Sequence, residues 1–189
     1  YLNVEIPAEP ENGFVMPYGD CPLDDDKVGE QVYMDMLNRA HRYVHIMTPY
    51  LILDGELENA LKYAAERGVD VRIMLPGVPD KYVPFALALT HYKSLLKSGV
   101  KIYEYTPGFV HAKVFVCDDQ EAVVGTINLD YRSLYHHFEC GTYLWGTDCI
   151  PAIAEDFEQT QAKCREITLD TLGAEPFKRR MLGFIAKAV

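Results

Sequence analysis

Four side chains in the middle of the chain have the types needed to bind and attack a phosphate group. His111 and Lys113 are two residues apart, and so are Thr126 and Asn128. An imidazole can act as a nucleophile or as a general acid and base. An ammonium neutralises anionic oxygens, and a hydroxyl and an amide donate hydrogen bonds. The combination predicts chemistry at a phosphoryl group, provided that the four side chains meet.

A hairpin would bring these side chains together. The segments on either side of Asp119-Gln120 are apolar and β-branched, which indicates two strands and a tight turn. Residues two apart on a strand share a face and lie roughly 7 Å apart. With a two-residue turn, positions whose numbers sum to 239 lie opposite each other. We therefore expect His111 to face Asn128, and Lys113 to face Thr126.

A second His-x-Lys sequence provides a control. His91 and Lys93 have the same spacing, but their segment has a helical pattern and no Gly-Thr-x-Asn sequence follows it. Residues two apart on a helix do not share a face. His-x-Lys alone is therefore weak evidence, and the strand setting with Gly125-Thr126-x-Asn128 beyond it gives the pattern around His111 its weight.

Short apolar strands and amphipathic helices surround the hairpin. We expect strands at 13–18, 43–48, 69–75, 100–105 and 138–145, and helices at 28–42, 56–67, 82–97, 150–165 and 176–189. Asp148 is the expected N-cap of the helix at 150–165. This order predicts the α/β class, as a single α/β/α sandwich with a mixed, largely parallel central sheet.

The chain divides into three segments. Residues 1–12 are polar and contain proline, which predicts a linker from a preceding segment. Residues 13–170 form the expected domain, and residues 171–189 a C-terminal amphipathic helix with basic residues on it. Such a helix can lie on an anionic lipid surface, or pack on its own domain.

Charge and composition limit the classes of partner. The formal charge is −10, from 18 basic and 28 acidic residues, which argues against nucleic acid as a ligand. The five cysteines have no disulfide or metal-ligand spacing, so we expect no metal and no cofactor. No run of apolar residues is long enough to cross a membrane, and the domain itself is expected to be soluble. His45 is expected to be a satisfied core histidine, and His136 and His137 to lie on the surface.

The spacing His111-x-Lys113-(x)4-Asp118, followed by Gly125-Thr126-x-Asn128, resembles the H-K-D signature of the phospholipase D superfamily. Further phrases resemble the carboxy-terminal half of bacterial cardiolipin synthases: Thr48-Pro49-Tyr50, Arg67-Gly68-Val69-Asp70-Val71-Arg72-Ile73, Tyr103-Glu104-Tyr105-Thr106-Pro107-Gly108-Phe109, Asn128-Leu129-Asp130 with Arg132-Ser133, and Arg165-Glu166-Ile167-Thr168-Leu169. The resemblance covers about residues 13–170. It departs from the family at Thr126, where serine is usual, although threonine keeps the hydroxyl.

The resemblance implies a role for each signature residue. His111 is the nucleophile that forms a phosphohistidine, or the general acid and base if the histidine of a second motif attacks. Lys113, Thr126 and Asn128 would bind the phosphoryl oxygens. Glu139, at the distance where the family places a glutamate, would hold the second ring nitrogen of His111. Asp118 sits at the turn, too far along the strand to touch the same phosphate, and is expected to fix the turn or a nearby cation.

The resemblance also implies substrate, partner and location. Family enzymes build one active site from two H-K-D motifs, and this chain has one, so we expect a second half from the same full-length chain or from a second subunit. The expected reaction joins two phosphatidylglycerol molecules into cardiolipin with release of glycerol, at a bacterial inner membrane reached through segments outside this chain. The alternatives are a single-motif phosphodiesterase or nuclease acting as a homodimer, and a non-catalytic half that binds lipid or a partner.

Overall fold

The computed structural model describes residues 12–173. Its strands are β1 (Phe14–Asp20), β2 (Tyr43–Met47), β3 (Leu51–Ile52), β4 (Asp70–Pro76), β5 (Lys101–Tyr105), β6 (Val114–Cys117), β7 (Glu121–Gly125), β8 (Leu129–Asp130), β9 (Glu139–Trp145) and β10 (Cys164–Ile167). Its helices are α1 (Val28–Arg39), α2 (Gly55–Glu66), α3 (Tyr82–Lys97), α4 (Tyr131–Tyr135), α5 (Ile150–Gln161) and α6 (Leu169–Gly173). The predicted helix at 176–189 and most of the predicted linker lie outside the described residues.

Eight strands form one sheet in the order β1-β9-β7-β6-β2-β4-β5-β10, and β3 pairs with β8 in a small second sheet. In the large sheet, β4 pairs in parallel with β2 and with β5. The other pairings of this sheet are antiparallel. The predicted α/β class and mixed sheet are confirmed, with the parallel pairing confined to these three strands.

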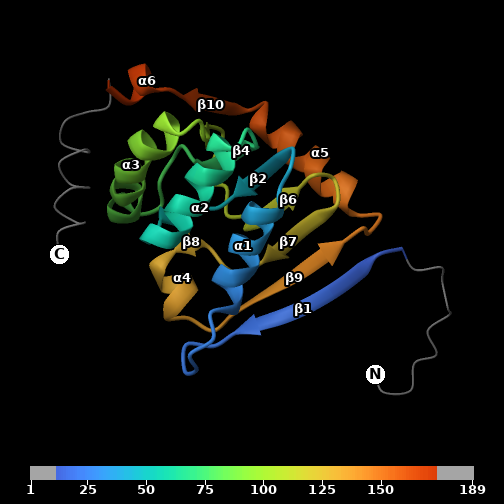
Figure 1. Ribbon diagram of the computed structural model, residues 1–189. Coiled ribbons are helices and arrows are strands. Elements are labelled where there is room, and N and C mark those ends of the chain that lie inside the picture. The colour runs from blue at the N-terminus through green and yellow to red at the C-terminus, as the bar shows by residue number, and fades with distance from the viewer. Residues whose placement is uncertain (1–11, 174–189) are drawn as a thin grey trace.

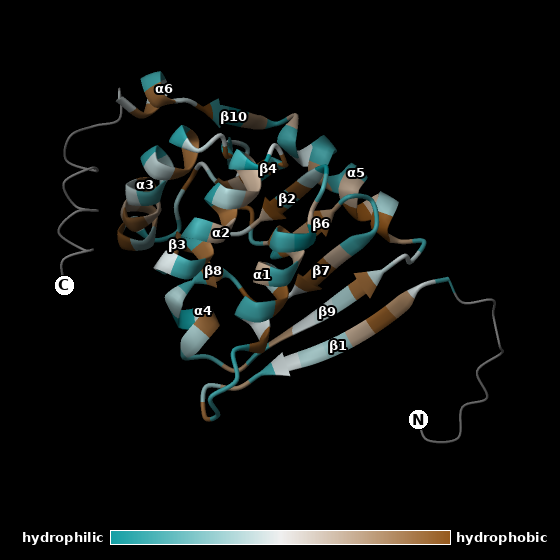
Figure 2. Ribbon diagram, in the orientation of Figure 1, coloured by the Kyte–Doolittle hydropathy of each residue, from teal (hydrophilic) through white to brown (hydrophobic). Residues whose placement is uncertain are grey.

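Helices cover both faces of the sheet. The core on one face combines α1, α2 and α3 with the strands, and the Tyr33 ring stacks on Phe115 there with ring centroids 4.0 Å apart. On the other face α5 contributes Ile150 and Phe157, which are fully buried. Figure 1 shows α1 and α2 in front of the sheet and α5 at its far side. Figure 2 shows apolar segments along the central strands, as expected for strands covered on both faces.

The hairpin register differs from the prediction by one residue. The pairs are Val114 with Val124 and Cys117 with Glu121, so facing numbers sum to 238. Asp118 and Asp119 both have positive φ, at 55° and 59°, and the Gln120 N–H donates to the Cys117 carbonyl at 3.0 Å. The loop between the strands therefore has three residues. A two-residue turn at 119–120 was the wrong expectation because sequence alone did not reveal the left-handed conformation of Asp118.

Helix α5 differs from the prediction in its last residue and in its N-cap. The helix expected at 150–165 ends at Gln161, and residues from Cys164 onward form the edge strand β10. Cys149, not Asp148, occupies the N-cap position of α5, without a capping hydrogen bond from its side chain. Pro151 in the first turn has no N–H that requires a cap. The Asp148 carboxylate instead accepts hydrogen bonds from Asn12 Nδ2 at 3.2 and 3.3 Å.

Candidate active site

Four of the predicted residues, His111, Lys113, Thr126 and Asn128, lie at the edge of the sheet where β2, β4 and β5 reach their carboxyl ends. Because β6 is antiparallel to β2, and β7 to β6, the amino end of β6 and the carboxyl end of β7 meet at this edge. His111 and Lys113 immediately precede β6, and Thr126 and Asn128 immediately follow β7. The sequence predicted that these four residues lie within the two strands of the hairpin. In the structure they lie just outside the strand ends. The carboxyl edge of parallel strands is where open α/β sheets bind ligands.

His111 and Lys113 contact each other directly. Lys113 Nζ lies 3.1 Å from His111 Nδ1 and donates to the His111 carbonyl at 2.6 Å. An ammonium has only donors, so Lys113 can donate to His111 Nδ1 only when that nitrogen carries no proton. His111 is exposed, and the Phe109 ring lies 5.7 Å from its ring. The pair thus places an exposed imidazole beside a half-buried ammonium.

Burial lowers the pKa of Lys113, while the nearby carboxylates of Glu139 and Asp130 act in the opposite direction. These two carboxylates belong to the segments that follow β7 and to the start of β9. These carboxylates favour the charged form of Lys113, and a cation here can bind an anionic group.

Thr126 is fixed by close backbone contact between β7 and β9. Its N–H donates to the Cys140 carbonyl at 2.8 Å, and its Oγ1 accepts from the Cys140 N–H at 2.9 Å. The preceding Gly125 permits this approach, since a Cβ there would lie 2.4 Å from the Cys140 carbonyl oxygen. Thr126 Oγ1 also donates a short hydrogen bond to Glu139 Oε2. Thr126 and Glu139 are therefore neighbours at the site.

Asn128 is held by the short helix α4. Its Nδ2 donates to Ser133 Oγ at 2.9 Å, while its Oδ1 is buried and has no hydrogen-bond partner among residues 12–173. Ser133 is positioned because Asp130 caps α4 and accepts from the Ser133 N–H at 2.9 Å. Thr48, also buried, accepts from the Leu129 N–H at 3.1 Å and so ties this segment to the end of β2.

Ser133 and Thr48 are site-supporting residues that sequence reasoning gave no role, although both fall in phrases on which the resemblance rested. The signal that could have found Ser133 is its spacing of three from Asp130, typical of an N-cap pair. His137 was assigned to the surface. Its side chain is 48% exposed, and its Nδ1 lies 3.6 Å from Glu139 Oε1.

Glu139 lies at the site, at the start of β9, but its contacts are with Thr126 and His137. In the described residues no hydrogen bond joins Glu139 to His111. Figure 1 shows α4 at the end of the sheet where β1 terminates and β9 begins. The site is thus assembled from the loop before β6, the end of β7, α4 and the start of β9.

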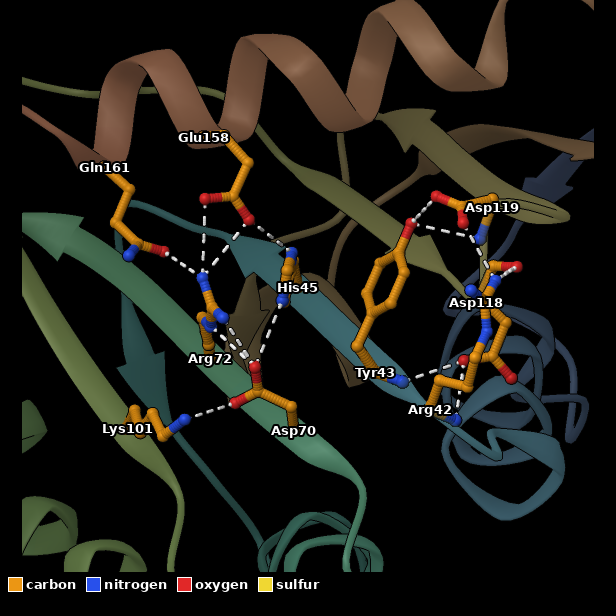
Figure 3. A network of polar contacts seen from close by, with 10 residues as sticks. All are labelled: Arg42, Tyr43, His45, Asp70, Arg72, Lys101, Asp118, Asp119, Glu158 and Gln161. Carbon is orange, nitrogen blue, oxygen red and sulfur yellow. Dashed lines mark hydrogen bonds and ion pairs between the residues drawn. The ribbon is translucent and has the colours of Figure 1, made fainter.

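Asp118 lies at the other end of the hairpin. Its carboxylate accepts from three consecutive backbone N–H groups, those of His41 at 2.7 Å, Arg42 at 2.9 Å and Tyr43 at 2.8 Å. These hydrogen bonds lower the pKa of Asp118 against the opposing effect of burial. Asp118 thus ties the turn to the connection between α1 and β2 (Figure 3), away from the other signature residues.

Two histidines that were not assigned to the site, His91 and His45, lie within the body of the fold. His91 is in helix α3, where its Nδ1 is 2.8 Å from Glu58 Oε2, so the helical setting predicted for the second His-x-Lys sequence is confirmed. His45 is buried in β2, as expected of a core histidine, with Nδ1 3.5 Å from Glu158 Oε1 and Nε2 3.9 Å from Asp70 Oδ2. Its Nε2 makes no hydrogen bond with residues 12–173, so the ring is only partly satisfied. Among residues 12–173, no group of three or more His, Cys, Asp or Glu side chains is arranged to hold a metal ion.

Comparison with known proteins agrees with this geometry. The family model described as the phospholipase D-like domain of cardiolipin synthase (PLDc_2) matches residues 33–161. The chain belongs to this phospholipase D-like family.

The chain is 34% identical over 187 residues to a cardiolipin synthase of Geobacillus kaustophilus, of which it covers 37%. It is 62% identical to an uncharacterized protein of Streptococcus mutans, of which it covers 41%. The chain therefore spans about two fifths of the length of these relatives.

Two solved structures share the fold. Nuc from Salmonella typhimurium, a phospholipase D family member, has a TM-score of 0.69 at 16% identity, with 82% of this chain and 98% of that chain covered. Phosphatidylserine synthase from Haemophilus influenzae also has a TM-score of 0.69, at 18% identity, with 92% of this chain and 45% of that chain covered. The fold therefore corresponds to one whole chain in the first case and to less than half of one in the second.

Proposed function

We propose that this chain is one half of a phosphatidyl transferase that makes cardiolipin from two phosphatidylglycerol molecules and releases glycerol. The observation that carries the proposal is the meeting of His111, Lys113, Thr126 and Glu139 at one sheet edge in a chain of this family. The similarity to cardiolipin synthases over nearly the whole chain supports the choice of lipid.

The first step is attack by a neutral His111 nitrogen on the phosphorus of one phosphatidylglycerol. A P–N bond forms, the P–O bond to the terminal glycerol breaks, and that alkoxide takes a proton from the histidine of the second half. In the second step the hydroxyl of another phosphatidylglycerol attacks phosphorus, passes its proton to the same second histidine, and releases His111. If the second histidine is the nucleophile, His111 performs the proton transfers.

Lys113 neutralises the phosphoryl oxygens in both steps. It contacts His111 directly, so it stands beside the reacting atom whichever histidine attacks. Asn128 uses one amide N–H for Ser133, and its second N–H is available to a phosphoryl oxygen. Thr126 donates to Glu139, so it acts on the phosphate after its hydroxyl turns, or else by holding Glu139.

The second half completes the site. The segments around His111 also carry exposed apolar side chains, among them Phe109 and Phe138 on loops and Tyr131 at the start of α4. Phe109 lies against His111, and Phe138 precedes Glu139. Apolar side chains around an incomplete site fit a surface that packs against a partner domain. No helix among residues 12–173 is both long and apolar enough to cross a bilayer, so on this proposal the membrane is reached through other segments.

The test is an assay of the full-length enzyme with phosphatidylglycerol vesicles. We expect cardiolipin and glycerol in equal amounts, loss of both products in His111→Ala, and little or no activity in the isolated 189-residue chain. Release of phosphatidic acid without cardiolipin would show that the enzyme hydrolyses phosphatidylglycerol and does not transfer the phosphatidyl group to a second lipid. Full activity of a verified monomer of the isolated chain would contradict the half-site.

A homodimeric phosphodiesterase or nuclease is the second candidate. It is favoured by Nuc, since this fold accounts for 98% of that chain. It is opposed by the net charge of −10, because nucleic-acid binding depends on neutralising phosphates with basic side chains. Cleavage of single-stranded DNA by the isolated chain, without any lipid product from the full-length enzyme, would select this candidate.

A further inference from the structure

The two carboxylate oxygens of Glu139 face different side chains. Oε2 accepts the hydrogen bond from Thr126 Oγ1, and Oε1 lies 3.6 Å from His137 Nδ1. The Glu139 side chain is only 9% exposed, whereas that of His137 is 48% exposed. Glu139 is thus bracketed by a threonine from the end of β7 and a histidine from the segment before β9.

A buried carboxylate needs partners for both oxygens. An ionised group removed from water without hydrogen bonds or opposite charge is strongly destabilised. Thr126 satisfies one oxygen of Glu139, and the second faces the ring of His137. His137 lies in a bend two residues before β9, and its Nδ1 is within ion-pair distance of Oε1, at 3.6 Å.

We propose that His137 is a positioning residue of the active site, which holds the Glu139 carboxylate in place through Oε1. The proposal rests on the proposed phosphoryl-transfer function for its activity readout. Glu139 acts on Lys113 electrostatically, and Lys113 contacts His111. A displaced Glu139 would therefore shift the charge that orients Lys113 beside the reacting histidine, and kcat should fall more than KM rises.

The other titratable groups around His137 decide which readout is informative. His137 lines a pocket of about 140 Å³ with Tyr135, Asp20, Lys27 and the acidic residues of the loop between β1 and α1. Asp20 is also the cross-strand partner of Glu139 in the β1–β9 pairing. Several of these groups would contribute to a pH profile, so rescue by an uncharged donor is the sharper test.

The chain offers a matched control in the neighbouring histidine. The His136 ring packs against Tyr131 with ring centroids 5.4 Å apart, on α4 rather than on Glu139. We would compare His137→Ala, His137→Asn and His136→Ala in the full-length enzyme. Asparagine keeps an N–H donor near Oε1 but carries no charge and cannot titrate.

Each variant would be assayed on phosphatidylglycerol vesicles and on bis(p-nitrophenyl) phosphate, a soluble phosphodiester. We expect His137→Ala to lower kcat about tenfold, the effect of one hydrogen bond to a charged group, with KM changed less than about twofold. His137→Asn should recover most of the loss, and His136→Ala should stay within about twofold of the parent. Unchanged melting temperatures would exclude unfolding as the cause.

The two substrates separate this proposal from the proposed function. If the parent enzyme cleaves the soluble diester but makes no cardiolipin, the transferase assignment fails and His137 is still judged on the soluble substrate. The proposal is overturned if His137→Ala matches the parent, or if His137→Asn is as impaired as His137→Ala.

A spectroscopic measurement does not depend on activity. In full-length enzyme with labelled histidine, Glu139→Gln should change the ring NMR signals of His137 at pH 7 and leave those of His136 in place. Unchanged His137 signals would also overturn the proposal, whether or not either substrate is turned over.

Discussion

Polar residues at the two ends of the sheet strands differ in how many of their partners lie within the protein. The hairpin β6–β7 runs from one end to the other. At the carboxyl edge of the parallel strands, His111 is exposed and Asn128 Oδ1 is buried without a partner in the described part of the chain. At the other edge, the Asp118 carboxylate accepts from three backbone N–H groups. One signature therefore contributes an open site at one end of a hairpin and a closed structural contact at the other.

The amino edge of the parallel strands carries a second structural network, shown in Figure 3. Asp70 accepts from Arg72 at 2.6 and 2.9 Å and from Lys101 at 2.8 Å. Arg72 also donates to Glu158 of α5 at 3.2 Å, which joins the helix to the sheet. Burial, and next the charge of Arg72, lower the pKa of His45 beside this network to about 4, so His45 is neutral at physiological pH.

The difference shows how to assign roles within a signature. Residue type and spacing place His111, Lys113 and Asp118 in one motif, but only the partners in the fold separate a group kept for substrate from a group used for stability. A polar side chain with all its partners inside the protein stabilises the fold, whereas one left open at a sheet edge is available for chemistry. The following substitutions would break or sharpen this contrast.

Lys113→Met is expected to have the largest effect, and on activity alone. Removing a cation that faces the phosphoryl oxygens should lower kcat by roughly 10² to 10³-fold, about 3 to 4 kcal/mol in activation free energy. The melting temperature should stay within about 2 °C, because among residues 12–173 the hydrogen bonds of the ammonium are to the neighbouring His111. Steady-state kinetics and thermal unfolding of the full-length enzyme measure both. A large loss of stability would place Lys113 with the structural residues.

Asp118→Asn should produce the opposite pattern. Asparagine tolerates the positive φ of this position, but its amide has one acceptor oxygen and presents N–H donors to backbone N–H groups. We expect unfolding to become easier by about 2 kcal/mol, with kcat per folded molecule nearly unchanged. Denaturant unfolding, with kinetics normalised to active enzyme, would test this. A fall in kcat at unchanged stability would assign Asp118 to catalysis.

A cluster of Glu30, Asp54 and Tyr135 lies near the site, and a substitution at Glu30 tests whether its role is structural. The Tyr135 hydroxyl contacts Glu30 at 2.7 Å and also Asp54, and one hydroxyl hydrogen cannot serve both carboxylates. Burial, and next the hydrogen bond with Asp54, raise the pKa of Glu30 from its ordinary 4.5 to about 6. A raised pKa means that the folded state binds the proton more tightly than the unfolded state.

Its stabilising contribution is therefore fully present below pH 4.5 and is lost as the pH rises through 6. We expect the free energy of unfolding to fall by about 1 kcal/mol between pH 5 and 8, after allowance for solvent screening. Glu30→Gln should remove this part of the slope, measured as the difference between the two proteins across the range. If the free energy of unfolding of Glu30→Gln has the same pH dependence as that of the parent, Glu30 is not its cause.

The sequence predicted the elements with a strong period and missed contacts made across the fold. The bounds predicted for α3, residues 82–97, agree with the structure because its apolar residues recur at helical spacing. The two-residue strands β3 and β8 are too short to produce a period, so the second sheet was not predicted. At the start of β10, Cys164 and Arg165 were assigned to the preceding helix, since an apolar period continued to that point.

The site was predicted in composition but only partly in geometry. The residue types and their meeting at one end of a hairpin followed from sequence, whereas the register was wrong by one residue and the four side chains lie beyond the strand ends. Ser133 and His137 received no role, because their contacts with Asn128 and Glu139 depend on how α4 packs. Such contacts are set by tertiary structure and leave little trace in local spacing.

The smallest expected effect comes from the residue next to Asp118. Asp119 also has positive φ, but its carboxylate is exposed and bonds to side chains, to the half-buried Tyr43 Oη at 2.6 Å and to the exposed Arg42 at 2.8 Å. Asp119→Asn keeps the turn conformation and removes one exposed charge, which should change the free energy of unfolding by about 0.5 kcal/mol or less. Because both aspartates occupy the same left-handed turn, the pair of Asn variants isolates the side-chain contacts. Equal destabilisation of the two would mean that the three backbone hydrogen bonds of Asp118 stabilise the fold no more than the side-chain contacts of Asp119 do.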